Sequence, residues 1–272
     1  MTMVASPPPL PVRARATSQD RTTGALSPML RRLAEEKATG VLVREHGTLH
    51  LAEGRVVHAE SPRAPGLDVL LTAHGTLDGS AWQRAAGQAG GSAETAELLL
   101  SEGELTEGAL ELCHLDALYD AGFFALSPSG VPGHFVYDGT PQLGALPSVP
   151  VVALEHETLR RRLLLHRLWP DPATDSAPLI RAAPADAAPV TPRARAVLDQ
   201  VDGVRTAPGI ARELGRQAFH TLVDVRRLAG AGLVRPAVAA PEPPPVPPGP
   251  ALAVTDPDIA LLKRLRDALE AL

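Results

Sequence analysis

The stretch VLVREHGTLHLAEGRVVHAE, residues 41–60, decides the fold of the N-terminal part of the chain. Its β-branched and alternating apolar residues are interrupted at His46-Gly47 and at Glu53-Gly54. Each interruption is a two-residue turn that ends in glycine, a pattern typical of β-hairpins. The stretch therefore predicts three short antiparallel strands that follow one another as a meander.

Side chains along a strand point alternately to its two faces. Leu49 and Leu51 are expected to face the core, with Val57 and Ala59 on the adjoining strand, and His58 on the opposite face. A lone histidine in a strand is more often a hydrogen-bonded structural residue than a metal ligand or a base, and no nucleophile or paired acid is identifiable around His58. We therefore expect no catalytic role for it.

Helices are predicted on both sides of the meander in the sequence. Ser27 and Pro28 form an N-cap and a first helical residue. Residues 78–124 are expected to be helical, with breaks at Gly90-Gly91 and at Gly103. A small antiparallel β-meander covered by helices is an α+β layout.

The glycine and histidine pattern of this region is similar to that of a known family. The segments TGVLV (39–43), GTLHL (47–51) and EGRVVHA (53–59), with LLLSEGELTE (98–107) and Leu110 downstream, resemble the PATAN-type domain of bacterial signalling proteins. The resemblance extends from Ser27 to about Val136. It departs from the family at Leu51-Ala52, where an aromatic residue is common.

The PATAN resemblance implies a protein-interaction or regulatory module and not an enzyme. It points to Arg55 and His58 as interaction residues, and a signalling protein is the implied partner of this part of the chain.

A second amphipathic helix is predicted over residues 149–169. Its apolar positions are expected to be Leu154, Leu159, Leu163 and Leu168. The arginines at 160–162 could touch nucleic acid or an acidic partner, but a charge run of this kind is more often a solvated helix face.

Proline divides the chain, because it fixes φ and supplies no amide donor. The 28 prolines concentrate near the start, in the middle and near the end of the chain. The domains that follow are a disordered tail (1–25), the PATAN-like α+β domain with its following helix (26–170), a Pro/Ala linker (171–190), a basic module (191–236), a Pro-rich linker (237–254) and a tail helix (255–272).

Composition sets the class of protein. The net charge of -5 excludes a uniformly basic nucleic-acid coat. Cys113 is the single cysteine, and the start of the chain carries no secretory signal, so a cytoplasmic location is expected. No uncharged apolar run approaches the roughly 18 residues of a membrane helix, so no membrane contact is expected.

The basic module, with eight arginines against four acidic residues, has its own pattern of helices. Thr191 and Thr206 are expected to cap the first two helices, Val204-Arg205 to form a short strand between them, and residues 218–229 to form the third helix, with a strand following. The segments IARELG (210–215) and VRRLAGAGLV (225–234) resemble the winged helix-turn-helix of bacterial transcriptional regulators such as the MarR group.

This second resemblance implies contacts with DNA. Ala218, Leu222, Val225 and Ala229 share one face of the third helix, which leaves His220, Asp224 and Arg227 outward. The DNA-contacting candidates are Arg216, Gln217, His220, Thr221, Arg227 and Arg235.

Two features of the same module oppose DNA binding. Asp224 would repel phosphate, and Arg235 runs directly into Pro236, so a second wing strand is expected to be absent. DNA binding and protein docking therefore both remain open for this module.

The tail over 255–272 predicts an amphipathic helix. Its stripe includes Leu262, Leu265 and Leu269 at steps of three and four. The stripe must be buried, so the helix either folds back on the body or docks on a partner or on a second copy of the chain, which would make a homodimer.

Motifs of catalysis are not found. The sequence has no phosphate-cradling glycine loop, no H-E-x-x-H, no C-x-x-C and no G-x-S-x-G. We expect no catalytic residues, no metal and no cofactor. The leading hypothesis is a bacterial DNA-binding transcriptional regulator whose N-terminal domain binds a signalling partner. The alternative is a signalling adaptor that uses both domains for protein contacts.

Overall fold

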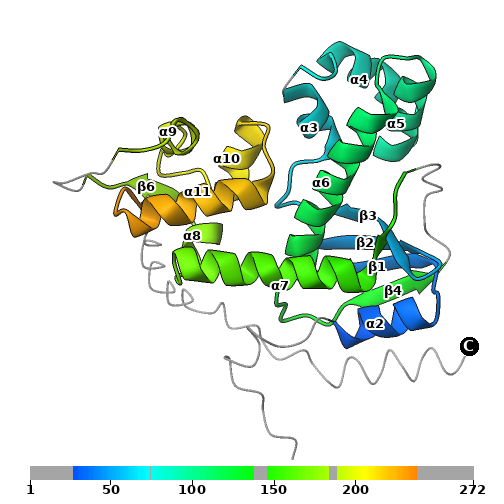
Figure 1. Cartoon of the computed structure of the whole chain (residues 1–272), viewed down its shortest axis with the longest axis horizontal. Coiled ribbons are helices and arrows are strands. Elements are labelled where there is room, and N and C mark those ends of the chain that lie inside the picture. Colours follow the sequence, from blue (N-terminus) through cyan, green and yellow to red (C-terminus); the bar gives the residue numbers. More distant parts are fainter. Residues whose placement is uncertain (1–26, 74, 138–145, 184–188, 238–272) are drawn as a thin grey trace, which may run out of the picture. The chain divides into compact units, whose positions relative to one another are not determined.

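The computed structural model describes most of the chain between residues 27 and 237. The described ranges are 27–73, 75–137, 146–183 and 189–237. They form an α+β structure in which helices accompany an antiparallel sheet (Figure 1), which confirms the predicted class.

The chain divides into two compact units after residue 237, and every described residue belongs to the first unit. Three predicted segments lie outside the described residues apart from Ala237: the tail over 1–25, the linker over 237–254 and the helix over 255–272. The last of these carries Leu262, Leu265 and Leu269.

The main sheet has five antiparallel strands in the order β4-β1-β2-β3-β5. The predicted meander supplies its centre as β1 (Gly40–Arg44), β2 (Gly47–Ala52) and β3 (Arg55–Glu60). Segments from later in the chain complete both edges, with β4 (His134–Tyr137) beside β1 and β5 (Val149–Pro150) beside β3.

A β-bulge in β3 changes which side chains enter the core. Leu49 and Leu51 are fully buried as predicted, and Ala59 is also buried. The register shifts between the pairs His50–His58 and Leu51–Val56, so Val57 is the extra residue of the bulge. Val56, rather than the predicted Val57, therefore faces the core, because a bulge reverses the order in which side chains alternate between the two faces of the strand.

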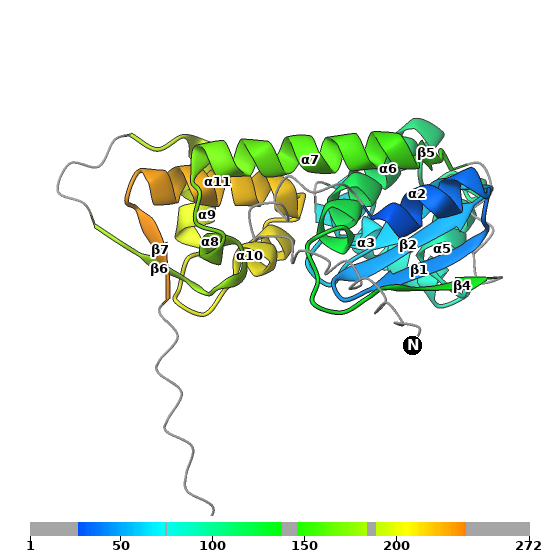
Figure 2. The same cartoon turned by 90° about the horizontal axis from the view of Figure 1, so that it is seen from below.

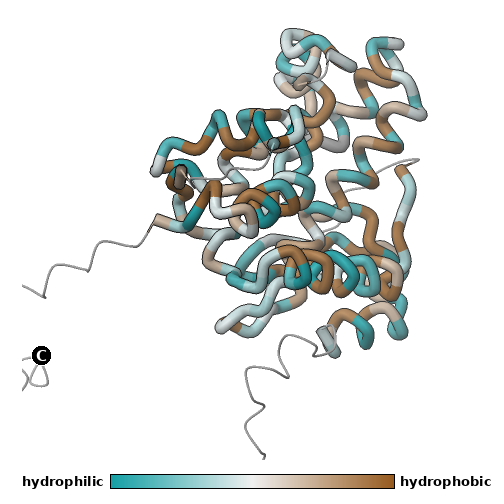
Figure 3. The backbone as a smooth tube through the Cα atoms, turned by 60° about the vertical axis from the view of Figure 1, so that its left-hand side comes forward, coloured by the Kyte–Doolittle hydropathy of each residue, from teal (hydrophilic) through white to brown (hydrophobic). Residues whose placement is uncertain are grey.

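The helices of the first 170 residues agree with the predicted breaks at Gly90-Gly91 and Gly103. They are α2 (Pro28–Glu35), α3 (Leu67–Ala73), α4 (Gly79–Ala86), α5 (Ser92–Ser101), α6 (Glu107–Ala125) and α7 (Val151–Leu168). Hydrophobic and hydrophilic residues alternate along their coils, as expected of helices that bury one side (Figure 3). The hydroxyl of Ser27 caps α2, as predicted, by accepting from the amide of Leu30.

The buried face of α7 differs from the predicted stripe. Leu154, Thr158, Arg161 and Leu165 are buried, whereas the side chain of Leu163 is half exposed. These buried positions recur at steps of three and four, so the predicted leucines span more than one face. The central arginine of the predicted solvated triplet is therefore an interior residue.

The C-terminal part of the described chain consists of four helices and a pair of strands. They are α8 (Ala173–Ser176), β6 (Leu179–Arg181), α9 (Pro192–Asp199), α10 (Ala207–Glu213), α11 (Ala218–Gly230) and β7 (Val234–Pro236). The predicted caps are present: Thr191 accepts from the amide of Ala194, and Thr206 accepts from that of Gly209. In both views α7 lies beside α11 (Figures 1 and 2), and the two helices are in contact.

The segment predicted as a linker over 171–190 contains both α8 and β6. β6 pairs antiparallel with β7, so the segment predicted as a linker supplies a partner strand for β7. The amide of Leu179 also donates to the carbonyl of Arg205, although Val204-Arg205 is not a strand. The sequence did not predict this pairing for two reasons. The high proline content of residues 171–190 indicated a linker, and the partner strand comes before the helices in the sequence rather than after them.

One carboxylate connects the C-terminal helices to α6. Asp120 is fully buried, and its two oxygens accept from the amides of Ala218 and Phe219 at 2.6 and 2.9 Å. These amides belong to the first turn of α11, where backbone donors have no partner within the helix. The buried apolar cluster is also continuous from Leu30 to Val234. The module predicted as separate thus shares its core with the preceding residues.

We predict that Asp120→Ala lowers the free energy of unfolding by about 2–4 kcal/mol, because it leaves two buried amides without an acceptor. Urea denaturation at neutral pH measures this change. Asp116→Ala is the matched control, since Asp116 lies one turn earlier on α6 and is exposed; its effect should stay within about 0.5 kcal/mol. Equal losses in the two variants would show that the cap contributes nothing.

The turn between α10 and α11 also touches α3 closely. Gly215 has φ of +59°, and a Cβ built there would lie 1.9 Å from the Cβ of Ala73. Gly103 has a similar φ of +74° but has open space around it. Gly103→Ala should therefore show only the backbone cost, on the order of 1 kcal/mol, and Gly215→Ala clearly more. Thermal denaturation of both variants compares them directly, and equal melting temperatures would contradict the close contact.

Candidate functional site

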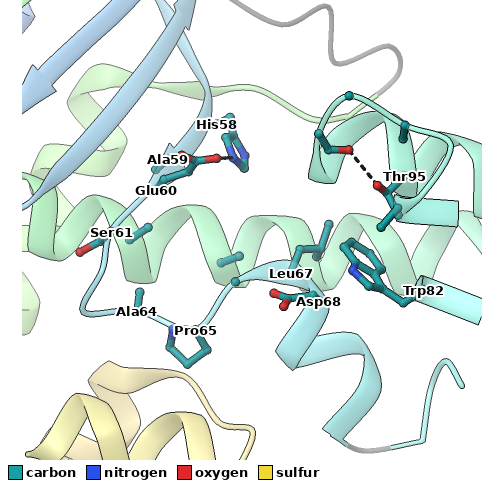
Figure 4. A pocket seen from close by; sticks show the side chains of 17 residues that line it. His58, Ala59, Glu60, Ser61, Ala64, Pro65, Leu67, Asp68, Trp82 and Thr95 are labelled. Atoms are coloured by element: carbon teal, nitrogen blue, oxygen red, sulfur yellow. Dashed lines mark hydrogen bonds and ion pairs between the residues drawn. The ribbon is translucent and has the colours of Figure 1, made fainter. Parts of the chain in front are cut away.

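A cavity of about 560 Å³ opens where β3 ends (Figure 4). Its walls come from β3, the loop that follows, α3, α4, α6 and the start of α5. Small apolar residues such as Ala117 and Ala121 of α6 line part of it, and Trp82 of α4 contributes the largest side chain. The volume lies in the range of ligand and peptide-binding sites.

The polar groups of the cavity are few. His58 and Glu60 of β3 point toward each other (Figure 4), with Nε2 of His58 3.2 Å from Oε1 of Glu60. This hydrogen bond lowers the pKa of Glu60. Asp68 of α3 and Thr95 of α5 also line the wall, and the hydroxyl of Thr95 donates to the carbonyl of Gly91.

The hydroxyl of Ser61 is not arranged as a nucleophile. It donates to the carbonyl of His46 at 2.7 Å and accepts from the amide of Arg63. An activated serine needs a base that takes its proton, and a backbone carbonyl cannot do so. The cavity therefore offers hydrogen-bonding groups and apolar walls for binding, with a carboxylate at Glu60 and another at Asp68 to favour donors or cations.

Two further histidines lie beside His58. His50 of β2 pairs with His58 in the sheet register, and their ring centroids are 5.4 Å apart. The ring of His114 from α6 stacks on that of His58, with 6.1 Å between the centroids. Burial, followed by the charge that His58 would carry, lowers the pKa of His114 to about 4. The same two causes lower the pKa of His50.

At neutral pH, His50 and His114 are therefore uncharged; His114 is buried and His50 is partly buried. Within the part of the chain that the structure describes, no group of three or more His, Cys, Asp or Glu side chains is placed to hold a metal ion. His58 is the member of the row that lines the cavity.

Arg55, the other predicted interaction residue of this region, is tied to the chain itself. Its guanidinium donates from Nε to the hydroxyl of Ser148 at 2.7 Å and from Nη2 to the carbonyl of Ser148 at 2.8 Å. Arg55 thus fastens the segment before β5 to the start of β3, and it does not line the cavity of His58.

The predicted DNA-contacting residues fall in three environments. Thr221 is 1 % exposed, so its side chain cannot reach a ligand on the surface. Arg227 and Arg235 are exposed. The remaining three, Arg216, Gln217 and His220, line one cavity at the start of α11.

Most of α11 is covered. Of its described residues, only His220, Arg227 and Gly230 are exposed. Asp224, predicted to point outward, is 2 % exposed and accepts from Nε of Arg193 at 2.6 Å. The prediction was wrong because α9 places an arginine over this position, which also removes the expected repulsion between Asp224 and an anion.

The opposite side of α11 is held by a buried arginine. Arg226 is 5 % exposed, and it donates to both oxygens of Asp175 at 2.8 and 2.6 Å and to the carbonyl of Trp169. A two-pronged contact of this kind fixes geometry as well as charge. It joins α11 to α8 and to the end of α7.

Comparison of the chain with protein-family models, with curated proteins and with solved structures gives no match. Among the helices that the structure describes, none has the length and apolar composition needed to cross a membrane.

Sequence reasoning missed the residues that join distant elements. Asp120, Arg161 and His114 were treated as ordinary parts of two helices. The one available signal was their position, because each carries a polar group on the side of its helix that also carries buried apolar residues. A polar residue at such a position indicates a specific partner elsewhere in the chain.

The pKa of His114 predicts a dependence of stability on pH. A histidine whose pKa is about 4 when folded and about 6.5 when unfolded binds protons more strongly in the unfolded chain. Its contribution is complete above pH 6.5 and is lost as the pH falls toward 4. When the pH falls from 7.5 to 4.5, the free energy of unfolding should therefore decrease by about 2–3 kcal/mol less in His114→Leu than in the wild type.

Urea denaturation at the two pH values measures this difference. Burial raises the pKa of Asp120 to about 6, which favours the folded state as the pH falls from 6 toward 3.8, but this contribution is shared by both proteins and cancels in the comparison. His134→Asn, on the exposed strand β4, serves as the control. The same pH slope in wild type and His114→Leu would contradict the assignment.

Proposed function

We propose that the chain is a regulatory adaptor in signalling, which binds a partner protein at the cavity of His58 and uses its C-terminal helices as a rigid docking surface and not as a reader of DNA. The observation that carries this proposal is the covering of α11. That helix corresponds to the recognition helix of the winged helix-turn-helix that the sequence resembles.

A recognition helix must enter the major groove with several outward side chains free. Several polar side chains of α11 are occupied by contacts within the chain: Thr221 is buried, Asp224 is paired with Arg193, and Arg226 is paired with Asp175. The exposed side chains that remain, His220 and Arg227, are too few for base recognition along a helix face.

The order of elements nevertheless supports a relationship to winged-helix proteins. Three helices, α9, α10 and α11, precede β7, and β7 is paired with β6 as a wing strand would be paired with its neighbour. Winged helices serve as protein-docking modules as well as DNA-binding ones, so this likeness fits the adaptor.

The N-terminal part supports partner binding more directly. The resemblance of residues 27–136 to PATAN-type domains implies an interaction module, and the cavity of His58 lies within that region. Its apolar walls, with the indole of Trp82 and a small number of polar groups, are the composition of a site that takes an extended segment or a side chain of another protein.

A rim substitution tests the cavity. Ala86 lies on α4 at the exposed edge of the cavity, and Gln83 is exposed on the same helix but does not line the cavity. Ala86→Trp should fill the entrance without unfolding the protein, whereas Gln83→Trp adds the same side chain elsewhere. In affinity capture from a native lysate followed by mass spectrometry, a partner retained by wild type and Gln83→Trp should be reduced at least about tenfold with Ala86→Trp.

A mobility-shift assay with salt titration addresses the competing hypothesis. The adaptor predicts no sequence-specific shift of genomic fragments at any salt concentration. A shift that falls steeply with salt and is lost in Arg227→Gln would instead support the transcriptional regulator.

Equal capture of every partner by the two tryptophan variants would remove the cavity from the proposal.

A further inference from the structure

A second cavity, of about 490 Å³, lies where the C-terminal helices meet α3 and α6. Leu70 of α3 and Cys113 and Asp116 of α6 form one side of it. Arg193 of α9 and the turn before α11 form the other side. The close contact between Gly215 and Ala73 brings this turn against α3.

The charged groups around this cavity are mostly basic. Arg193 and Arg216 line it together with His220, and the one acidic lining residue is Asp116, which is exposed. Arg193 is held in place, because Nε donates to Asp224 at 2.6 Å and Nη2 donates to the carbonyl of His220 at 3.0 Å. Its charge is thus largely compensated by Asp224.

Arg216 has no such compensation. Its Nη1 is buried without a hydrogen-bond partner, and no carboxylate of the described residues lies within ion-pairing distance of its guanidinium. Arg216 is partly buried and lines the cavity, so the protein leaves its positive charge there uncompensated. An uncompensated cation in a cavity favours an anionic ligand, and the charge of Arg216 therefore favours an anion at this wall.

The structure assigns this cavity, by our inference, as a binding site for a small oxyanion, a phosphate or carboxylate group, with Arg216 as its main donor. Arginine binds such groups through two parallel N–H donors, and the amide of Gln217 and the imidazole of His220 stand beside it as further hydrogen-bonding groups. The volume admits a small molecule and excludes a nucleic-acid duplex. This site is separate from the cavity of His58 and does not depend on the adaptor proposal.

Occupation of the site would connect two parts of the core. The oxyanion would contact the turn before α11 while it lies against α3 and α6, next to the Asp120 cap of the same helix. Because ligand bound to the folded state alone stabilises that state, the binding should raise the melting temperature.

Inorganic phosphate and succinate, each compared with chloride at equal ionic strength, are the probes. Calorimetric titration should give a saturable isotherm for at least one of them at neutral pH, with a parallel rise in melting temperature. Arg216→Gln should weaken this binding at least about tenfold, because a hydrogen bond to a charged group is lost. Arg227→Gln, an exposed position on α11 outside the cavity, should leave it unchanged.

Modification of Cys113 provides a second, independent measurement of binding, because Cys113 is the single cysteine of the chain and lines this cavity. The rate at which a thiol reagent modifies Cys113 should fall when the probe is bound, and Arg216→Gln should abolish this protection. If Arg216→Gln does not fold, Gln217→Glu places a carboxylate in the same wall and should also abolish binding.

The two probes distinguish the sources of the oxyanion. Preference for phosphate assigns the site to phosphorylated metabolites, and preference for succinate assigns it to carboxylic acids. Absence of saturable binding and of Cys113 protection with both probes would overturn the proposal, as would binding that is lost in Arg227→Gln but retained in Arg216→Gln and Gln217→Glu.

Discussion

The structure depends most on the buried carboxylate of Asp120, which supplies the acceptors for the first turn of α11. Nη1 of Arg161 lies 3.6 Å from it, and the same guanidinium lies over the ring of Phe219. Burial makes the ionised form costly, which is why the pKa of Asp120 rises to about 6 despite these contacts. A buried carboxylate is stable only where its hydrogen-bond donors surround it, and one arrangement of α6, α7 and α11 provides them. Asp120 therefore specifies how these helices pack together.

The features that could be read from the sequence are those with a local cause. The turns at Gly47 and Gly54 placed the meander, and the hydroxyls of Ser27, Thr191 and Thr206 marked the starts of three helices, because a turn or a cap is decided by residues within a few positions of each other. The α+β class follows directly from such signals. They required no knowledge of how the rest of the chain packs.

The features that could not be read are those in which distant residues complete one another. The pair Arg226–Asp175 and the cap at Asp120 join positions 51 and 98 residues apart, and neither partner carries a pattern that indicates the other. The bulge at Val57 has no composition signal either. The candidate site was found only in part, since His58 was singled out from the sequence but the walls of its cavity come from four helices that packing alone brings together.

The pairing of β6 with β7 determines which residues must be transferred together if the C-terminal part is to fold in another protein. The helices over 191–236 look portable in the sequence, but a fragment that starts at Thr191 would leave behind the strand that covers the edge of β7. Exposed strand edges invite pairing with other chains. Any transplantation of this part into another protein must therefore carry residues from well upstream of its first helix, and evolution would have faced the same constraint in recombining it.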